Sequence, residues 1–260
     1  MLDVRDLTKT YDPAGAPAMA DLTFTVGERE FVCIVGSSGC GKTTMLRCLS
    51  GLVAPTSGTV TLDGTPVYGP PKDMAFVFQD YSRSLLPWMT VAGNVSFPLS
   101  YKGLSKAQAA AATAEALAAV GLADRGDSYP WQLSGGMQQR VAIARALAYQ
   151  PRILLMDEPF ASVDAQTRAD LEDLLLDIWR RYDITVLFVT HDIDEAVYLA
   201  QRVLVLRRPA HVHEIVEVDL PAERDQLATK QLPRFGELRS HVLSSLRSPQ
   251  AADTPSVIPG

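Results

Sequence analysis

A glycine-rich stretch of eight residues has the composition of a binding site for phosphate groups. It begins at Gly36, ends in Lys42 and Thr43, directly follows the apolar run Phe31 to Val35, and opens a helical run that stops at Gly51. Glycines let successive backbone N–H groups face an anion, and the helix N-terminus adds the positive end of its dipole. The lysine supplies a charge for the β- and γ-phosphates, and the threonine a hydroxyl for Mg²⁺. The order of strand, loop and helix favours a nucleotide site over a simple glycine turn. The predicted nucleotide contacts here are Gly36, Ser37, Ser38, Gly39, Cys40, Gly41, Lys42, Thr43 and Thr44.

Two adjacent carboxylates follow a second apolar run. Asp157 and Glu158 come directly after the residues Ile153 to Met156. Carboxylates at the end of a buried strand are costly unless a cation or water uses them. We expect Asp157 to bind Mg²⁺ through water, and Glu158 to take a proton from an attacking water, a contribution of roughly 10²–10⁴ in rate. By itself Glu158 could equally be a solvated acid at a strand end, but the phosphate loop upstream favours the catalytic interpretation.

The elements that must position these residues follow the pattern of an α/β fold. Short apolar runs rich in Val, Ile and Leu alternate with stretches of helical period, as in a parallel sheet that is covered on both faces. The main predicted strands end in polar or glycine residues, where ligands of open α/β sheets bind. These strands are Phe31 to Val35, Ile153 to Asp157 and Thr185 to Thr190. Shorter strands, partly antiparallel, are expected at Leu2 to Leu7, Leu22 to Val26, Thr59 to Leu62 and Ala75 to Phe78.

A helical insert is expected between residues 80 and 149, where the strand signal disappears. Ser105 to Val120 is rich in alanine, and Gly121 ends this predicted helix. After Arg207 the sequence becomes charged and is interrupted by prolines, with one predicted helix from Phe235 to Leu246. The last ten or so residues, rich in Pro, Ala and Ser, are expected to be disordered.

The composition excludes several classes of protein. The chain has 260 residues, of which 47% are hydrophobic and 21% charged, so it is neither disordered nor fibrous. A net charge of -6 does not suggest a nucleic-acid partner. The apolar runs are shorter than the roughly 20 residues that a membrane span needs, and the N-terminus lacks a secretory signal, so a cytoplasmic protein is expected. Cys33, Cys40 and Cys48 lack metal-ligand spacing and are interpreted as reduced and structural.

A second glycine motif distinguishes between the many families with a phosphate loop. Residues 133–140, LSGGMQQR, resemble the signature sequence of ATP-binding-cassette (ABC) ATPases. Physically the motif is another helix N-terminus backed by glycines, able to bind phosphate through its N–H groups and a serine hydroxyl. The resemblance implies that Ser134, Gly135 and Gly136 complete the ATP site of the opposite subunit, so that ATP is held at a homodimer interface. Met137 stands where many members have Gln, which leaves Ser134 and Gly136 unchanged.

The resemblance covers the chain from Tyr11 to about Leu206 and assigns further roles. Tyr11 matches an aromatic residue that stacks on adenine, and Gln79 a glutamine that contacts Mg²⁺ and the attacking water. His191 matches a histidine that contacts the γ-phosphate. Taken alone, these would be a strand-end packing residue, a polar residue after a strand and a structural histidine. The segment Ser162-Val163-Asp164 resembles the loop that crosses the dimer interface.

Finer features resemble importers of the nitrate, sulfonate and taurine type. They are LLPW at 85–88, MDEPFASVDAQTR at 156–168 and VTHDIDEAVYLAQRVLVL at 189–206, with weaker support from 218–221 and 232–246. In such systems the surface near LLPW receives a helix of the membrane subunit. An exposed Trp88 would then be a docking residue, whereas the alternative is a core residue of the helical insert.

The expected fold is therefore α/β: a P-loop NTPase core of ABC type, with a mostly parallel sheet, helices on both faces, an antiparallel β subdomain and an inserted helical subdomain. Residues 1–79 and 150–215 form the predicted ATP-binding core, 80–149 the helical subdomain with the signature motif, and 216–260 a C-terminal segment. The predicted function is ATP hydrolysis that powers import of a small anion or organic solute, with ATP and Mg²⁺ as cofactors.

The predicted partners are a second copy, transmembrane permease subunits and, indirectly, a solute-binding protein, with no nucleic acid. The predicted location is peripheral, at the cytoplasmic face of the membrane. The catalytic candidates are Glu158, His191 and Gln79, and the metal candidates Thr43, Gln79 and Asp157. Two alternatives are a soluble ABC ATPase without a transport role, which would usually carry long coiled-coil insertions or two cassettes, and a degenerate regulatory cassette. The presence of Lys42 and Asp157 beside the catalytic candidates argues against the second.

Overall fold

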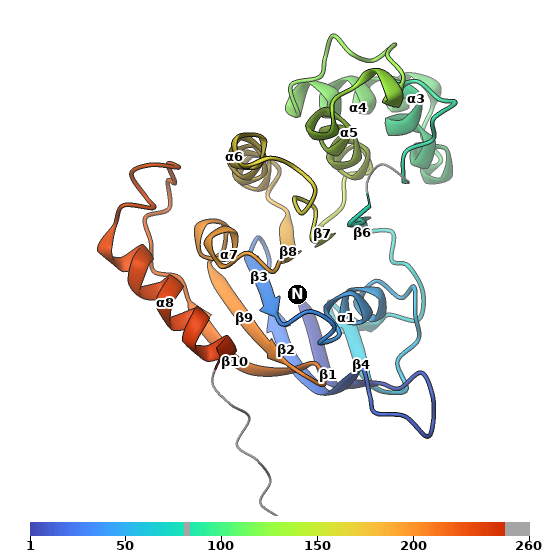
Figure 1. Ribbon diagram of the computed structural model, residues 1–260. Coiled ribbons are helices and arrows are strands. Elements are labelled where there is room, and N and C mark those ends of the chain that lie inside the picture. The colour runs from blue at the N-terminus through green and yellow to red at the C-terminus, as the bar shows by residue number, and fades with distance from the viewer. Residues whose placement is uncertain (81–83, 248–260) are drawn as a thin grey trace, which may run out of the picture.

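The computed structural model describes residues 1–80 and 84–247. Its central element is a six-stranded sheet with the order β10-β9-β3-β8-β7-β6 (Figure 1), in which all neighbouring strands are parallel except β9 and β10. The three main predicted strands are confirmed as β3, β7 and β8. The strands are β3 (Phe31–Gly36), β6 (Met74–Val77), β7 (Ile153–Asp157), β8 (Thr185–Val189), β9 (Arg202–Arg207) and β10 (His211–Glu217).

Both faces of this sheet are buried, which explains why its strands read as uninterrupted apolar runs. Successive side chains of a strand point to opposite faces. In β3, Cys33 and Val35 join one apolar core while Val32 and Ile34 join the other. The first core lies under α5 (Gly135–Ala148), α6 (Ala165–Tyr182), α7 (Ile193–Leu199) and α8 (Pro233–Arg247). The second lies under α1 (Lys42–Leu49) and an antiparallel sheet.

That antiparallel sheet has the order β2-β1-β4-β5. Three of the predicted short strands lie in it, whereas the fourth, Ala75 to Phe78, overlaps β6 of the main sheet and runs parallel to β7. Alternate residues of β1, including Leu2 and Val4, are buried against the second core, which fixes the register. The strands are β1 (Leu2–Lys9), β2 (Met19–Val26), β4 (Ser57–Leu62) and β5 (Thr65–Pro66).

The described residues between 84 and 149 form helices that gather at one end of the molecule, away from the antiparallel sheet (Figure 1). The predicted helix at Ser105 to Val120 is confirmed as α4. It begins with a capping box, in which Ser105 and Gln108 each bind the other's backbone N–H, and Gly121 follows with a φ of 72°. The helices here are α3 (Val91–Ser96), η1 (Phe97–Lys102), α4 (Lys106–Ala119), η2 (Pro130–Gln132) and α5.

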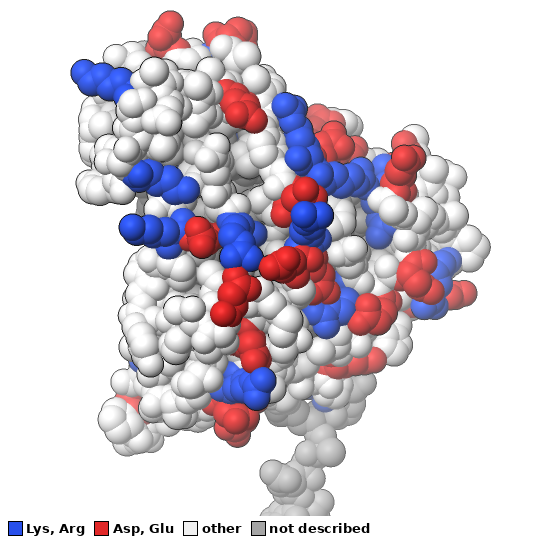
Figure 2. Space-filling view, turned by 180° about the vertical axis from the view of Figure 1, so that it is seen from behind, with Lys and Arg blue, Asp and Glu red and all other residues white. Residues whose placement is uncertain are grey.

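The C-terminal part of the chain returns to the sheet. The helix predicted at Phe235 to Leu246 is confirmed as α8, which packs against α7 and β9. The disorder predicted for the last ten or so residues lies outside the described residues. Figure 2 shows charged side chains of both signs interspersed in a band across one face, with no large area of a single sign. Among residues 1–80 and 84–247, no helix combines the length and hydropathy that crossing a bilayer requires.

Candidate nucleotide-binding site

The phosphate loop joins the end of β3 to the start of α1. The buried Nζ of Lys42 donates hydrogen bonds to the carbonyl oxygens of Gly36 at 2.8 Å and Ser37 at 3.3 Å, so the lysine lies along the loop. Gly41 caps α1 with a φ of 113°, and a Cβ there would lie 2.3 Å from the carbonyl oxygen of Ala18. Only glycine fits this position, because both the backbone angle and the close approach exclude a side chain.

Asp157 ends β7 beside this loop. Its side chain is buried, and Oδ1 has no hydrogen-bond partner among the described residues. Burial raises the pKa of Asp157, and the neighbouring hydroxyl of Thr43 opposes that rise. A buried carboxylate oxygen without a partner, next to a hydroxyl, is a donor set that suits a hard cation such as Mg²⁺. The residues present therefore fit the metal that the sequence implies.

Glu158 lies where four separate elements meet. Its Oε2 is 3.0 Å from Nδ1 of His191 and accepts a hydrogen bond of 3.4 Å from Nε2 of Gln79. Its Oε1 is 3.7 Å from Nζ of Lys42. These partners follow β8, β6 and β3, so the parallel sheet delivers all of them to the same edge.

The backbone of Glu158 is itself unusual. Its φ of 43° is left-handed, and its N–H donates to the carbonyl oxygen of Val189 at 2.9 Å. Left-handed backbone in a residue other than glycine costs of the order of 1 kcal/mol and persists only where surrounding structure enforces it. Here the bond to β8 holds the backbone of Glu158 in this turn, and the carboxylate lies near Lys42 and His191.

Tyr11 lies at the rim of the same site. Its side chain is 61% exposed, and its hydroxyl is 3.4 Å from Oγ1 of Thr44, directly after the phosphate loop. Nζ of Lys9 lies 5.2 Å from the centre of the ring. An exposed aromatic ring beside the loop has a face available for a base, so its stacking role stays a prediction that the geometry permits.

The signature segment is not brought to the phosphate loop of the same chain. Ser134 caps α5 by accepting a hydrogen bond of 3.3 Å from the N–H of Met137. A Cβ on Gly136 would lie 2.4 Å from Cγ2 of Thr167 in α6, which gives this glycine a packing role besides the predicted phosphate contact. A cavity of about 360 Å³ beside Ser134 is bordered by Arg125 and other polar residues, but by no residue of the phosphate loop.

Trp88 is 70% exposed, which rules out the alternative that it is a core residue of the helical insert. The docking role for Trp88 stays a prediction.

The sequence analysis missed the ion pairs beside His191, in which Arg168 contacts Asp192 and Glu195. The sequence THDIDE contains a signal for these pairs, because three acids follow the histidine with no basic residue nearby. An acid that becomes buried needs a cation, which must then come from another part of the chain.

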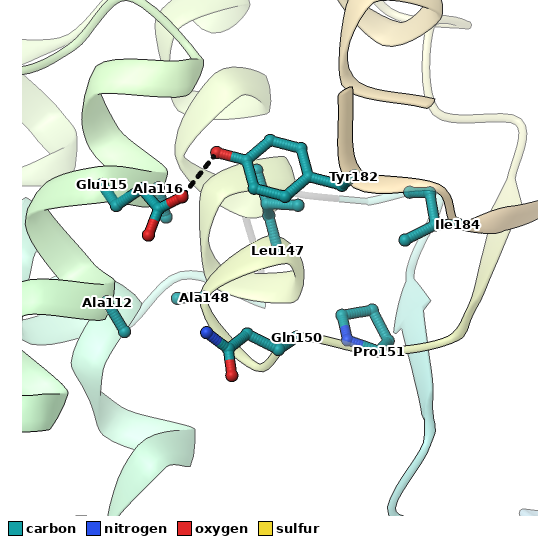
Figure 3. A pocket seen from close by; sticks show the side chains of 9 residues that line it. All are labelled: Ala112, Glu115, Ala116, Leu147, Ala148, Gln150, Pro151, Tyr182 and Ile184. Carbon is teal, nitrogen blue, oxygen red and sulfur yellow. Dashed lines mark hydrogen bonds between the residues drawn. The ribbon is translucent and has the colours of Figure 1, made fainter. Parts of the chain in front are cut away.

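A cavity of about 310 Å³ lies elsewhere, between the helical region and the sheet (Figure 3). The hydroxyl of Tyr182, at the end of α6, donates to Oε1 of Glu115 in α4 at 3.3 Å across it. Apolar side chains such as Leu147 and Ile184 form much of the rest of its lining. None of the predicted site residues borders this cavity, so we interpret it as incomplete packing between α4, α5 and the end of α6.

Comparison with known proteins shows the family of the chain. The family model described as ABC transporter matches residues 19–161. The chain belongs to the ABC transporter ATP-binding family. This ABC ATPase is 44% identical over 253 residues to a taurine import ATP-binding protein of Pseudomonas entomophila, covering 95% of this chain and 97% of that protein. It is 41% identical over 264 residues to a nitrate import ATP-binding protein of a Synechocystis species, covering 98% of each.

A solved structure extends the comparison to the fold of the ABC ATPase. A dimeric ATP-binding cassette in a post-hydrolysis state, bound to ADP and phosphate, superposes with a TM-score of 0.74 at 34% identity. The match covers 84% of this chain and 99% of that one. The predicted α/β fold of ABC type is thus confirmed, and the chain is an ATP-binding ATPase of this family.

Proposed function

We propose that this ABC ATPase hydrolyses ATP to power import of a small anion or organic solute of the nitrate, sulfonate or taurine class. The observation that carries the hydrolytic part is the convergence of Lys42, Gln79 and His191 on the Glu158 carboxylate at the phosphate loop. The names of the taurine and nitrate import relatives support the transport part. The predicted division into a core at 1–79 and 150–215 and a helical unit at 80–149 belongs to the same proposal.

Each residue has a defined task in this mechanism. Lys42 places a positive charge beside the β- and γ-phosphates. Glu158 orients a water molecule or removes its proton, and His191 and Gln79 hold the Glu158 carboxylate in place. Thr43, Asp157 and Gln79 would hold Mg²⁺, which neutralises negative charge on the phosphate oxygens when it is bound.

The site needs a second copy of the chain to be complete. Ser134 is the N-cap of α5, and Gly135 and Gly136 are its first two residues, whose N–H groups have no partner within the helix and can bind the nucleotide of a partner. The dimeric form of the solved cassette supports this arrangement. Closure of such a dimer on two ATP molecules would move permease subunits that dock near Trp88, at the cytoplasmic face of a membrane, and a solute-binding protein would deliver the solute to them.

The first experiment compares the purified chain with Glu158→Gln. We expect the unmodified chain to turn over ATP, and the variant to bind ATP, hydrolyse it at least about 100-fold more slowly and accumulate as a dimer when ATP is present. Turnover is measured by phosphate release, and size by light scattering with and without ATP. Equal hydrolysis by both proteins would remove Glu158 from the catalytic role.

The transport assignment needs its own measurement. The chain is reconstituted with its permease subunits in vesicles, and ATP turnover is measured with nitrate, taurine or a sulfonate supplied through the binding protein. Stimulation by one of these solutes would support the import role. Stimulation by none, with an otherwise active ATPase, would reject the solute class while keeping the hydrolytic mechanism.

A further inference from the structure

The loop that carries His191 is fixed on both sides by side chains. Oγ1 of Thr190 donates to Oε2 of Glu195 at 2.6 Å and accepts from the N–H of Asp192 at 2.9 Å. The carboxylate of Asp192 also caps α7 by accepting from the N–H of Asp194 at 2.9 Å. Since His191 lies between these anchored residues, its position opposite Glu158 depends on what holds them.

Arg168, in the first turn of α6, is the cation that holds them. Its Nη1 donates to Oδ2 of Asp192 at 3.0 Å, and its Nε lies 3.4 Å from Oε1 of Glu195. Its Nη2 also donates to the carbonyl oxygen of Val163 at 3.5 Å. One planar guanidinium group therefore touches both the loop of His191 and the segment Ser162 to Asp164.

The neighbouring residue extends this connection to the signature segment. Oγ1 of Thr167 donates to Oδ2 of Asp164 at 2.7 Å, and the N–H of Thr167 donates to Oδ1 at 3.0 Å. The methyl group of Thr167 packs closely against Gly136, where an added Cβ would lie 2.4 Å from Cγ2. Thr167 and Arg168 thus lie between the signature segment, which is expected to contact the nucleotide of a partner, and His191, which is expected to contact the nucleotide of its own chain.

We propose that Arg168 is a positioning residue, which ties the loop of His191 to the segment Ser162 to Asp164 and so makes the geometry around Glu158 depend on the dimer interface. This inference rests on the proposed function, because it assumes hydrolysis at a dimer interface. The alternative is that Arg168 only balances the charges of Asp192 and Glu195, in which case its loss would affect folding but not the chemistry at His191.

The test uses Arg168→Met beside Arg180→Met, a matched change on the same helix. Arg180 contacts Asp177 and the carbonyl oxygen of Ala222, away from the nucleotide site. We expect Arg168→Met to lower kcat about ten- to hundredfold, as small displacements of catalytic groups do, and to leave the Kd for ATP within about twofold. Arg180→Met should change neither value by more than about twofold.

A double-mutant cycle separates positioning from a general structural effect. In a His191→Ala background, measured over hours with labelled ATP, Arg168→Met should cost less than about twofold further, because the residue through which it acts is gone. A loss of the same size in both backgrounds would overturn the inference. So would a kcat for Arg168→Met that stays within about twofold of the unmodified chain.

Folding is controlled with a second variant. If Arg168→Met alone does not fold, Arg168→Met combined with Glu195→Gln removes the guanidinium and its buried acidic partner together and is compared with Glu195→Gln. A reduced kcat in the combined variant supports the inference, and an equal kcat overturns it. An unmodified chain that hydrolyses no ATP would overturn both proposals, whereas an active chain that is indifferent to Arg168→Met overturns this one alone.

Discussion

Replacement of Glu195 by Gln tests the electrostatics beside the predicted active site. Glu195 is 4% exposed, in α7, and burial raises the pKa of its carboxyl from 4.5 to about 7. The neighbouring acids Asp192 and Glu172 contribute to this rise, while the hydroxyl of Thr190 and the charge of Arg168 oppose it. The folded protein therefore binds a proton at this site over a pH range in which the unfolded chain has lost it.

The sign and size of the effect follow from this difference in proton binding. A carboxyl with a raised pKa in the folded state stabilises the protein fully below the unfolded pKa and loses that contribution as pH rises through the folded pKa. A shift from 4.5 to about 7 corresponds to about 3 kcal/mol, at roughly 1.4 kcal/mol for each factor of ten. Of this total, about 2 to 3 kcal/mol is lost between pH 5 and pH 8.

Glu195→Gln keeps an oxygen that accepts from Thr190 but removes the titration. Relative to the unmodified chain, the variant should gain about 2 to 3 kcal/mol of unfolding free energy between pH 5 and pH 8, or roughly 5–10 °C in midpoint temperature. Urea unfolding of both proteins at several pH values measures this difference, in which other titrating groups cancel. A difference that stays constant with pH, or changes in the opposite direction, would refute the reasoning, because it would mean that Arg168 keeps Glu195 charged in the folded state.

Two further predictions concern the rim of the site and the signature segment. Tyr11→Ala should weaken ATP binding by about 5- to 150-fold, the equivalent of about 1–3 kcal/mol of stacking, whereas the affinity of Tyr11→Phe should stay within about threefold. Isothermal titration with ATP measures both affinities. Equal affinities in all three proteins would exclude stacking. Gly136→Ala should destabilise the chain by about 1–3 kcal/mol, because the added Cβ meets Cγ2 of Thr167. Thr167→Ser removes that methyl group and should restore much of the lost stability. Urea unfolding measures both effects, and no rescue would mean that the Thr167 contact is not the cause of the loss.

The sequence alone determined those features whose pattern lies in consecutive residues. The phosphate loop is contiguous, so its glycines, Lys42 and Thr43 could be assigned from order and spacing. The helix at α4 could be assigned from its composition and its ending at Gly121, and the buried strands from their apolar runs. The strand and helix predictions were confirmed because the pattern that marks each element lies in consecutive residues, even where the stabilising contacts come from distant ones. The nucleotide contacts of the phosphate loop stay a prediction.

Only the tertiary structure decided what depends on residues far apart in the chain. The contacts of Glu158 with Lys42, Gln79 and His191 exist because parallel strands end at one edge of a sheet. Arg168 pairs with Asp192 and Glu195, 24 or more positions later. The acids of THDIDE indicate that a cation is needed, but not which residue supplies it. Burial, which sets the protonation of Glu195, likewise arises only when the helices pack on the sheet, because the free energy of a charge depends on the surroundings that the fold creates.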